Sequence, residues 1–313
     1  MSTDPLDKMG NPMIASMING QMPPIPIVDG HVHFWDTTKL TYDWLSDCGE
    51  LNAPMLPERM TCEIVHEESP VAFEITGMVQ VQADCAPDSS FDEIEMVRSM
   101  SDSYPIKGMV AYAPLEEGQA VRPILERLHN DSFVRGVRRS TQNEPDGFAC
   151  EEGYIEGLAM LGEYGLTADI CARAQQLSDV TAAIRSVRER GSNTAVVIDH
   201  VGKPRIPDYP FTQWETSLRE LAAIDGVHCK LSGLLPEVSD GQWNEQRIRP
   251  YLETAIDAFG IERVMFSGDW PIMKFVNATY KDWVSIVHSV VSPLGEAAVR
   301  AVFSSNATAF YGL

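Results

Sequence analysis

Residues 25–36 read IPIVDGHVHFWD, an apolar run of mostly β-branched residues that ends in His31, Val32 and His33. A nearly continuous run of this kind predicts a parallel strand that is covered on both faces. Because side chains alternate along a strand, we expect Asp29, His31 and His33 on one face, with both imidazoles at the carboxyl end. Such a pair could hold one divalent ion or polarise one carbonyl, although an isolated pair is more often packed or solvated.

Seven further segments have the same β-rich character, and segments of helical periodicity separate them. In residues 179–190, for example, Val180, Ile184 and Val187 form one stripe. Eight strands alternating with helices predict an α/β fold, a single (β/α)8 TIM barrel. A doubly wound sheet is the alternative, but no Gly-x-Gly-x-x-Gly follows the first strand. The expected strands are residues 25–34, 75–83, 106–114, 134–140, 166–171, 195–200, 227–232 and 263–268.

The predicted barrel occupies residues 25–313 as one domain. Residues 1–24 contain prolines, glycines and acidic residues without an apolar stretch, so we expect a flexible extension that is neither a signal peptide nor a membrane anchor. Residues 35–73 predict a long loop between the first two strands. Helices are expected at residues 57–68, 91–103, 119–130, 152–164, 178–190, 212–224 and 245–259, with closing helices at 280–290 and 296–309.

The charge balance narrows the class of partner. The chain has 24 basic and 45 acidic residues, a net charge of −21, which disfavours nucleic acid and anionic membrane surfaces as partners. No run approaches the roughly 20 apolar residues of a membrane-spanning helix. The six cysteines lack C-x-x-C spacing and are typical of reduced thiols in a cytoplasmic protein. We expect a cytoplasmic protein that acts on a small molecule and can form homo-oligomers.

Polar residues end other expected strands as well. His200 ends the sixth, and Asp269 follows the eighth. The carboxyl ends of barrel strands share one mouth, and the last strand lies beside the first, so both should lie near His31 and His33. Asp269 could accept a proton from water, although an N-cap or turn acid is the alternative. Alternation turns Asp199 toward the helices, which favours His200 as the site residue.

Basic residues also gather at the ends of expected strands. Arg138 and Arg139 end the fourth strand and point in opposite directions, so only one of them can face the mouth. Arg173 follows the fifth strand, and Lys230 lies within the seventh. Guanidinium groups suit the recognition of carboxylates or hydroxyls, and surface salt bridges are the alternative interpretation.

In this order, the motifs resemble the amidohydrolase superfamily, in the branch of TIM-barrel metal-dependent hydrolases that includes L-fuconolactone and L-rhamnonolactone hydrolases. The resemblance runs from residue 28 to the C-terminus. It implies that His31 and His33 bind metal or hold a substrate carbonyl, that His200 faces the same site, and that Asp269 is the general base and a further metal ligand. The segments that carry it are residues 29–36, 136–138, 199–204, 230–234, 265–271 and 306–307.

The chain departs from the family pattern in two ways. Ser267 and Gly268 stand in the reverse of the familiar Gly-Ser order before the aspartate, which could change the local backbone angle because glycine alone freely adopts positive φ. In addition, no lysine or glutamate ends the fourth strand and no histidine ends the fifth. A two-metal centre is therefore not expected. One divalent ion, Zn²⁺ or Mn²⁺, could bind, and the reaction could also dispense with it.

The resemblance implies a hydrolase that opens a sugar-derived lactone by adding water. Asp269 would take a proton from the water, while the histidines or a bound metal polarise the carbonyl. One alternative is a metal-dependent, non-oxidative decarboxylase of an aromatic or unsaturated acid, and another is a barrel that only binds its ligand. The expected substrate contacts are Trp35 and Trp270, stacking on a sugar ring, and Arg138, Arg173 and Lys230, orienting hydroxyl or carboxylate groups.

Overall fold

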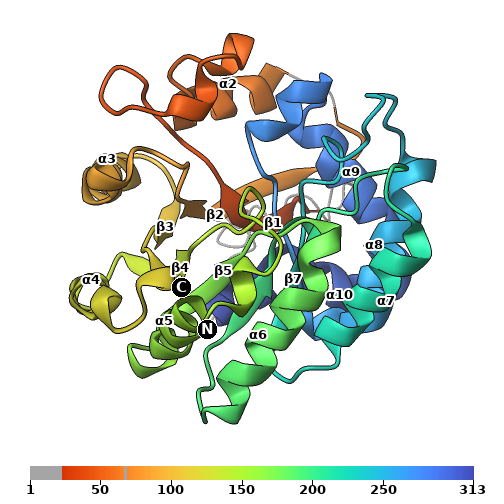
Figure 1. Cartoon of the computed structure of the whole chain (residues 1–313). Helices are drawn as coiled ribbons and strands as arrows, with labels where there is room; N and C mark the ends of the chain where they lie inside the picture. Colours follow the sequence, from red (N-terminus) through yellow and green to blue (C-terminus); the bar gives the residue numbers. More distant parts are fainter. Residues whose placement is uncertain (1–22, 67–68) are drawn as a thin grey trace, which may run out of the picture.

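A computed structural model describes residues 23–66 and 69–313 of the chain. Within these ranges, eight parallel strands follow one another in chain order around a barrel, with helices outside them (Figure 1). The predicted (β/α)8 barrel is therefore confirmed, while residues 1–22 of the expected extension lie outside the described residues. The strands are β1 (Ile25–Val32), β2 (Phe73–Val81), β3 (Ile106–Ala111), β4 (Val134–Arg138), β5 (Thr167–Ile170), β6 (Val196–Ile198), β7 (Val227–Leu231) and β8 (Val264–Phe266).

The first and last strands meet and close the barrel. Val32 forms a parallel bridge with Trp270, whose carbonyl accepts a hydrogen bond from the His33 N–H at 2.8 Å. The Asp269 N–H donates to the His31 carbonyl, also at 2.8 Å. These bonds join the exits of β1 and β8 directly, which excludes the open, doubly wound alternative.

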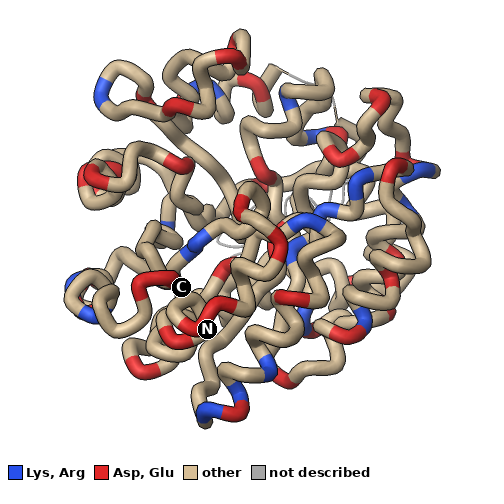
Figure 2. Tube along the Cα trace, viewed as in Figure 1, with Lys and Arg blue, Asp and Glu red and all other residues tan. Residues whose placement is uncertain are grey.

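Helices follow the strands and form the outer layer. In the view of Figure 2, acidic residues are scattered over these helices. None of the described helices is long and apolar enough to cross a membrane. The helices are α2 (Pro57–His66), α3 (Ser90–Ser101), α4 (Arg122–His129), α5 (Glu152–Glu163), α6 (Leu177–Glu189), α7 (Phe211–Ala222), α8 (Glu245–Phe259), α9 (Tyr280–Val291), α10 (Glu296–Arg300) and α11 (Asn306–Tyr311).

Most predicted helices match the observed ones within three residues at each end, and two others need separate description. The helix expected at residues 57–68 is described only to His66. The single closing helix expected at residues 296–309 is divided, because a π-helical turn, Ala301–Ser305, separates α10 from α11.

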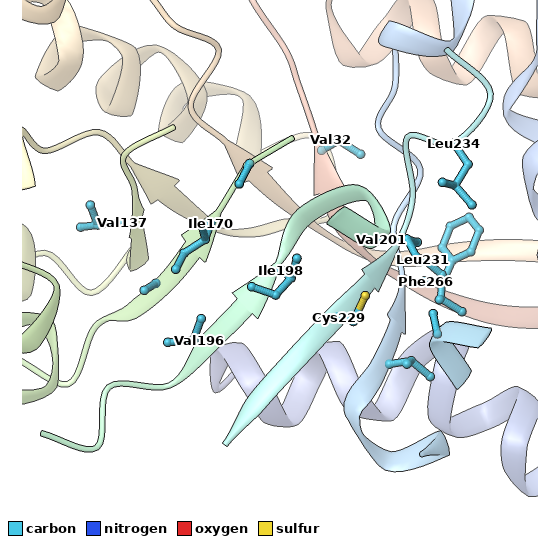
Figure 3. Close-up of a cluster of buried hydrophobic side chains, with 14 of the residues drawn as sticks. Val32, Val137, Ile170, Val196, Ile198, Val201, Cys229, Leu231, Leu234 and Phe266 are labelled. Atoms are coloured by element: carbon cyan, nitrogen blue, oxygen red, sulfur yellow. The ribbon is translucent and has the colours of Figure 1, made fainter. Parts of the chain in front are cut away.

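Strand side chains pack in two apolar layers. Those facing outward pack beneath the helices, and Figure 3 shows Val137, Ile170 and Ile198 among them. Those facing inward form a separate cluster to which α11 contributes Ala307 and Tyr311. The C-terminal helix therefore fills the barrel interior from one end. The inward strand residues are Val28, Val79, Val81, Val110, Val197 and Met265.

The expected alternation along β1 is interrupted after Asp29. The register between β1 and β2 shifts between Asp29 and Val32. The prediction that Asp29 shares the face of His31 and His33 is therefore wrong. The Asp29 carboxylate instead accepts a hydrogen bond from the Tyr280 hydroxyl of α9 at 2.8 Å. It also accepts from the N–H groups of His31 (2.9 Å) and Gly268 (2.8 Å), so one carboxylate links β1, β8 and α9.

Glu93 of α3 is a fully buried acid beneath the loop that follows β2. Its Oε1 accepts a hydrogen bond from the Ala83 N–H at 2.9 Å, while its Oε2 has no hydrogen-bond partner among the described residues. Burial raises the pKa of Glu93 to about 7, with a further contribution from nearby Asp84. Ionised Glu93 therefore destabilises the folded chain.

We expect Glu93→Gln to stabilise the protein increasingly as the pH rises from about 4.5 to about 7. The folded wild type holds the Glu93 proton more tightly than the unfolded chain, so deprotonation reduces wild-type stability across this window, whereas glutamine keeps the acceptor for Ala83 without titrating. Denaturant unfolding of both proteins at several pH values should show a difference that grows to about 3 kcal/mol at pH 8. A difference independent of pH would contradict this assignment.

Candidate active site

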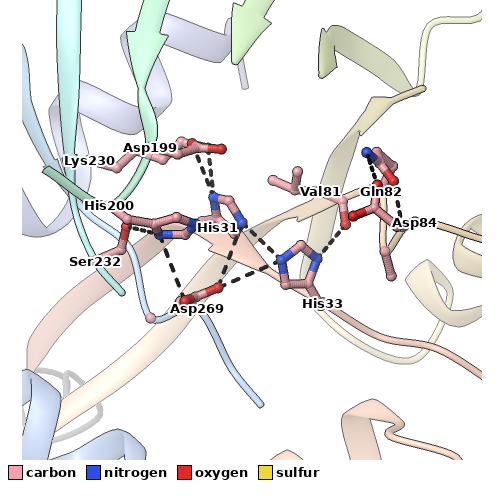
Figure 4. Close-up of polar contacts among 12 residues, drawn as sticks. His31, His33, Val81, Gln82, Asp84, Asp199, His200, Lys230, Ser232 and Asp269 are labelled. Carbon is pink, nitrogen blue, oxygen red and sulfur yellow. Dashed lines mark hydrogen bonds and ion pairs between the residues drawn. The ribbon is translucent and has the colours of Figure 1, made fainter. Parts of the chain in front are cut away.

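Three imidazoles and one carboxylate converge at the carboxyl ends of β1, β6 and β8 (Figure 4). His31 Nε2 and His33 Nε2 lie 3.0 Å apart, and Asp269 Oδ1 lies 3.8 Å from the first and 3.6 Å from the second. His200 Nδ1 lies 3.7 Å from Asp269 Oδ2 and 2.9 Å from Ser232 Oγ. The structure thus brings together the four residues that sequence motifs placed at one mouth.

A left-handed backbone conformation at His200 and at Asp269 determines the direction of both side chains. His200 has a φ of +53° and Asp269 a φ of +56°, values that are uncommon for residues other than glycine and that turn each side chain out of its strand alternation. Gly233 leaves the space that His200 fills, since a Cβ at this position would lie 2.5 Å from His200 Nδ1. The order Ser267-Gly268 was expected to change the local backbone angle. In the structure, Asp269 has the positive φ of this segment and Gly268 does not.

Burial determines the charge state of the cluster. Burial lowers the pKa of His31 and of His200 well below its usual value, and burial together with Arg138 lowers that of His33 to about 3. These imidazoles are neutral at physiological pH. Burial also raises the pKa of Asp269 to about 7, although Lys203 and Arg138 oppose this shift. A carboxylate with such a pKa can both accept and return a proton near neutral pH.

The donor atoms suit a single divalent ion. His31, His33 and Asp269 each present one ligand atom, and these atoms lie within 4.8 Å of one another. Ligands about 2.0–2.1 Å from a tetrahedral Zn²⁺ are about 3.3 Å apart, close to the three separations found here. Asp269 Oδ1 is buried without a hydrogen-bond partner among the described residues, as a position for a ligand requires. The residues present therefore fit a mononuclear site.

A buried ion network lies behind His31. Lys230 forms ion pairs with Asp169 and with Asp199, whose Oδ1 lies 3.0 Å from Lys230 Nζ and 3.3 Å from His31 Nδ1. The prediction that Asp199 faces the helices is wrong. Val197, two residues earlier, points into the barrel, so alternation turns Asp199 inward as well.

A cavity of about 220 Å³ opens onto the cluster. Of the five predicted substrate contacts, only Arg138 lines this cavity. The neighbouring Arg139 points away from the cavity and pairs with Glu116 and Glu144, as strand alternation predicts. Its walls also supply Lys203, which pairs with Glu237 at 2.7 Å. The lining residues are His33, Trp44, Ala83, Asp84, Arg138, Gln142, Asn143, Cys171, His200, Lys203, Asp269, Ile272 and Phe275.

The other four predicted contacts lie outside the cavity walls. The buried Trp35 indole donates to the carbonyls of Leu51 and Ala53, and that of Trp270 donates to Glu63. Hydrogen bonds from Arg173 reach Gln142 and Asn143, and Lys230 is enclosed behind His31. These four side chains could contact a substrate in the cavity only if they left the hydrogen bonds described here.

Some residues near the site escaped prediction. Trp44 and Phe275 supply the aromatic surface of the cavity that Trp35 and Trp270 were expected to provide. Both lie in short 3-10 helical turns, residues 43–45 and 272–276, whose course no strand pattern reveals. Asp169, in contrast, could have been predicted to lie near the site. An acid inside a mostly apolar strand is buried and needs a charged or hydrogen-bonding partner.

The sequence profile of the amidohydrolase family matches residues 28–313, which include every strand end described above. The chain belongs to the amidohydrolase family. L-fucono-1,5-lactonase from Burkholderia multivorans is 28% identical over 302 residues, which cover 91% of this chain and 96% of that protein. L-fucono-1,5-lactonase from Burkholderia ambifaria is 30% identical over 211 residues, 66% of this chain and 70% of that protein.

Solved structures share this amidohydrolase fold. An amidohydrolase from Burkholderia multivorans with bound zinc has a TM-score of 0.77 at 28% identity, and the match covers 92% of this chain and 99% of that chain. A 2,6-dihydroxybenzoate decarboxylase from Rhizobium has a TM-score of 0.59 at 14% identity, covering 93% of this chain and 99% of that one. The second likeness extends to the fold alone.

Proposed function

We propose that this amidohydrolase opens a sugar-derived lactone by adding water. The observation that carries the proposal is the convergence of three neutral imidazoles on the Asp269 carboxylate at the wall of a cavity, with His31 and His33 facing its unpartnered Oδ1 and His200 facing its Oδ2. Similarity to L-fucono-1,5-lactonases over most of the chain supports a lactone over the carboxylic acid of a decarboxylase. His31, His33, His200 and Asp269 are the proposed catalytic residues.

In the proposed reaction, Asp269 removes a proton from water as the water oxygen attacks the lactone carbonyl carbon. The Nε2–H of His31 and an N–H of His200 are the donors that stabilise the negative charge developing on the carbonyl oxygen, because His33 directs its own proton to Val81. The bond between the carbonyl carbon and the ring oxygen then breaks, and Asp269 returns its proton to that oxygen. The products are one free hydroxyl and one carboxylic acid on the opened chain, and the acid releases its proton to water to give a carboxylate. When bound to His31, His33 and Asp269, a divalent ion such as Zn²⁺ or Mn²⁺ supplies Lewis-acid polarisation.

The charges of the cavity favour a hydroxylated substrate. Lys203 is paired with Glu237, and Arg138 lies 3.7 Å from Asp199 while donating to the Gln82 carbonyl at 2.6 Å. Because protein acceptors already compensate both cations, they suit hydroxyl and ring oxygens better than an additional pair of carboxylates. Trp44 and Phe275 offer apolar surface for a sugar ring. This pattern supports an aldonolactone.

We expect Lys203→Met to reduce kcat/KM for the lactone about 10- to 100-fold, mainly through KM. Lys203 Nζ is a charged donor in the cavity wall, and the loss of one such hydrogen bond costs about 1.5–3 kcal/mol. Steady-state kinetics measure the change, with Lys39→Met as control, because Lys39 is exposed and pairs with Asp36 outside the cavity. An unchanged kcat/KM would remove Lys203 from the binding site.

A panel of aldonolactones, monitored by proton release, tests the proposed function directly. Parallel measurement of CO₂ release from aromatic and unsaturated acids tests the decarboxylase alternative. Each assay is run on the protein as purified, after chelation, and after addition of Zn²⁺ or Mn²⁺. Proton release with lactones alone supports the proposal, CO₂ release replaces it with the alternative, and inactivity in every assay leaves a barrel that only binds.

A further inference from the structure

Lys230 is a fully buried cation in contact with a proposed metal ligand. Its Nζ donates a hydrogen bond to Asp169 Oδ2. It also forms an ion pair with Asp199 Oδ1 at 3.0 Å and lies 3.0 Å from His31 Nδ1 (Figure 4). Burial opposes its charge, but Asp169 and Asp199 raise the pKa of Lys230, which therefore remains protonated. An ammonium group has three N–H donors and no acceptor, so Lys230 can donate to all three neighbours.

The contacts of His33 determine where the proton of His31 lies. His33 Nδ1 is 2.8 Å from the Val81 carbonyl, which can only accept, so His33 carries its proton on Nδ1. His33 Nε2 is then an acceptor, and His31 Nε2, 3.0 Å away, must donate to it. This leaves His31 Nδ1 as the acceptor facing Lys230. Hydrogen bonds thus run in one direction, from Lys230 through His31 and His33 to Val81.

A metal ion at this site requires the opposite arrangement of His31. To bind a cation, His31 Nε2 must present its lone pair, so the single ring proton must lie on Nδ1. There it can no longer accept from Lys230, and its acceptor becomes Asp199 Oδ1 at 3.3 Å. A carboxylate on the second nitrogen of a ligand histidine strengthens metal binding, whereas a cation beside that nitrogen opposes it.

We propose that Lys230 and Asp199 are opposing positioning residues that set the metal affinity of the site. Lys230 favours the metal-free form, in which His31 Nε2–H donates to His33, and Asp199 favours the form in which His31 Nε2 binds a divalent cation. On conversion, one proton leaves His31 Nε2 for water and another reaches Nδ1 from water, so the number of protons on His31 stays the same. The inference rests on the proposed metal site of His31, His33 and Asp269, and is independent of the identity of the lactone.

Zinc affinities of metal-depleted Lys230→Met and Asp199→Asn, measured by competition with a chromophoric chelator, test this inference. We expect Zn²⁺ to bind Lys230→Met at least tenfold more tightly than the wild type and Asp199→Asn at least tenfold more weakly. General loosening of the core would weaken binding in both variants, so opposite signs exclude it, and the tautomer of His31 separates a positioning role from the charges of the two residues alone. Thr194→Val, a buried substitution before the start of β6, where the Thr194 hydroxyl donates to the Leu158 carbonyl at 3.0 Å, should leave the affinity unchanged. Equal or weaker binding by Lys230→Met overturns the inference.

A second measurement needs no variant of the ion network. In ¹⁵N-labelled, metal-free wild type, histidine NMR correlations should show His31 as the Nε2–H tautomer, with the signal assigned by its loss in His31→Gln. Addition of Zn²⁺ should convert it to the Nδ1–H tautomer. An Nδ1–H tautomer before zinc is added would overturn the inference even where Lys230→Met fails to fold. Neither measurement depends on turnover, so failure on the lactone panel leaves both outcomes interpretable.

Discussion

Asp269→Asn is expected to lower kcat for lactone hydrolysis by about 10³-fold, because asparagine cannot accept the proton of the attacking water. The substitution keeps the size of the side chain, and the Asp269 N–H that bonds the His31 carbonyl is unaffected. Steady-state kinetics on a lactone that the wild type hydrolyses measure the loss. Circular dichroism and thermal unfolding should show that the variant remains folded.

The pH dependence provides a second readout of Asp269. Because burial raises its pKa to about 7, the base is protonated and inactive at lower pH. In metal-depleted enzyme, kcat/KM should therefore rise with pH through about 7 and level off above it. Asp257→Asn is the matched control, since Asp257 is exposed and pairs with Arg219 on the outer surface. Turnover close to wild type in Asp269→Asn would exclude Asp269 as the base.

Gly268→Ala should lower the stability of the protein strongly. A Cβ at residue 268 would lie 2.4 Å from Tyr280 Cε2 and 2.5 Å from Asp29 Oδ2, closer than real Cβ contacts. Asp29 and Tyr280 would have to separate, although their hydrogen bond helps to join β1, β8 and α9. We expect the free energy of unfolding to fall by about 3 kcal/mol, and kcat/KM to fall at least tenfold as Asp269 is displaced.

Gly77→Ala is the appropriate control for this effect. Gly77 lies in β2 at a negative φ, and its added Cβ would meet Lys107 and Val28 side-chain atoms at 3.3–3.4 Å. We expect its unfolding free energy to stay within about 1 kcal/mol of the wild type. If Gly268→Ala unfolds at the same denaturant concentration as Gly77→Ala, the close approach at the junction does not constrain the barrel.

The strands could be predicted because burial on both faces makes each one a short, nearly continuous apolar run. The same property hides which face of a strand points inward. The residues before Asp199 are Val196, Val197 and Ile198, which are all apolar. Their side chains therefore give no sign of which face points inward, and the direction of Asp199 could not be read from the sequence. Local backbone departures had the same effect: the register shift after Asp29 and the left-handed φ of His200 have no signature in composition.

Residues beyond the strand ends were harder to predict. Trp35 and Trp270 flank the motifs, yet both are buried outside the cavity lining, where each indole N–H donates to a protein acceptor. Trp44 reaches the cavity because its indole donates to the Ala83 carbonyl at 2.8 Å, a contact across 39 residues. Long-range pairings of this kind depend on the course of loops, which strand and helix periodicity does not describe.

The junction between β1 and β8 also determines when the protein can first act during its synthesis. Asp29 and Gly268, which bond each other there, are 239 residues apart in the chain. A ribosome must therefore release nearly the whole barrel before His31 and His33 can meet Asp269, and closing so long a loop is slow. A nascent chain that carries the paired histidines lacks Asp269, which is both the proposed base and the proposed third metal ligand. The proposed site is therefore complete only at the final step of barrel closure.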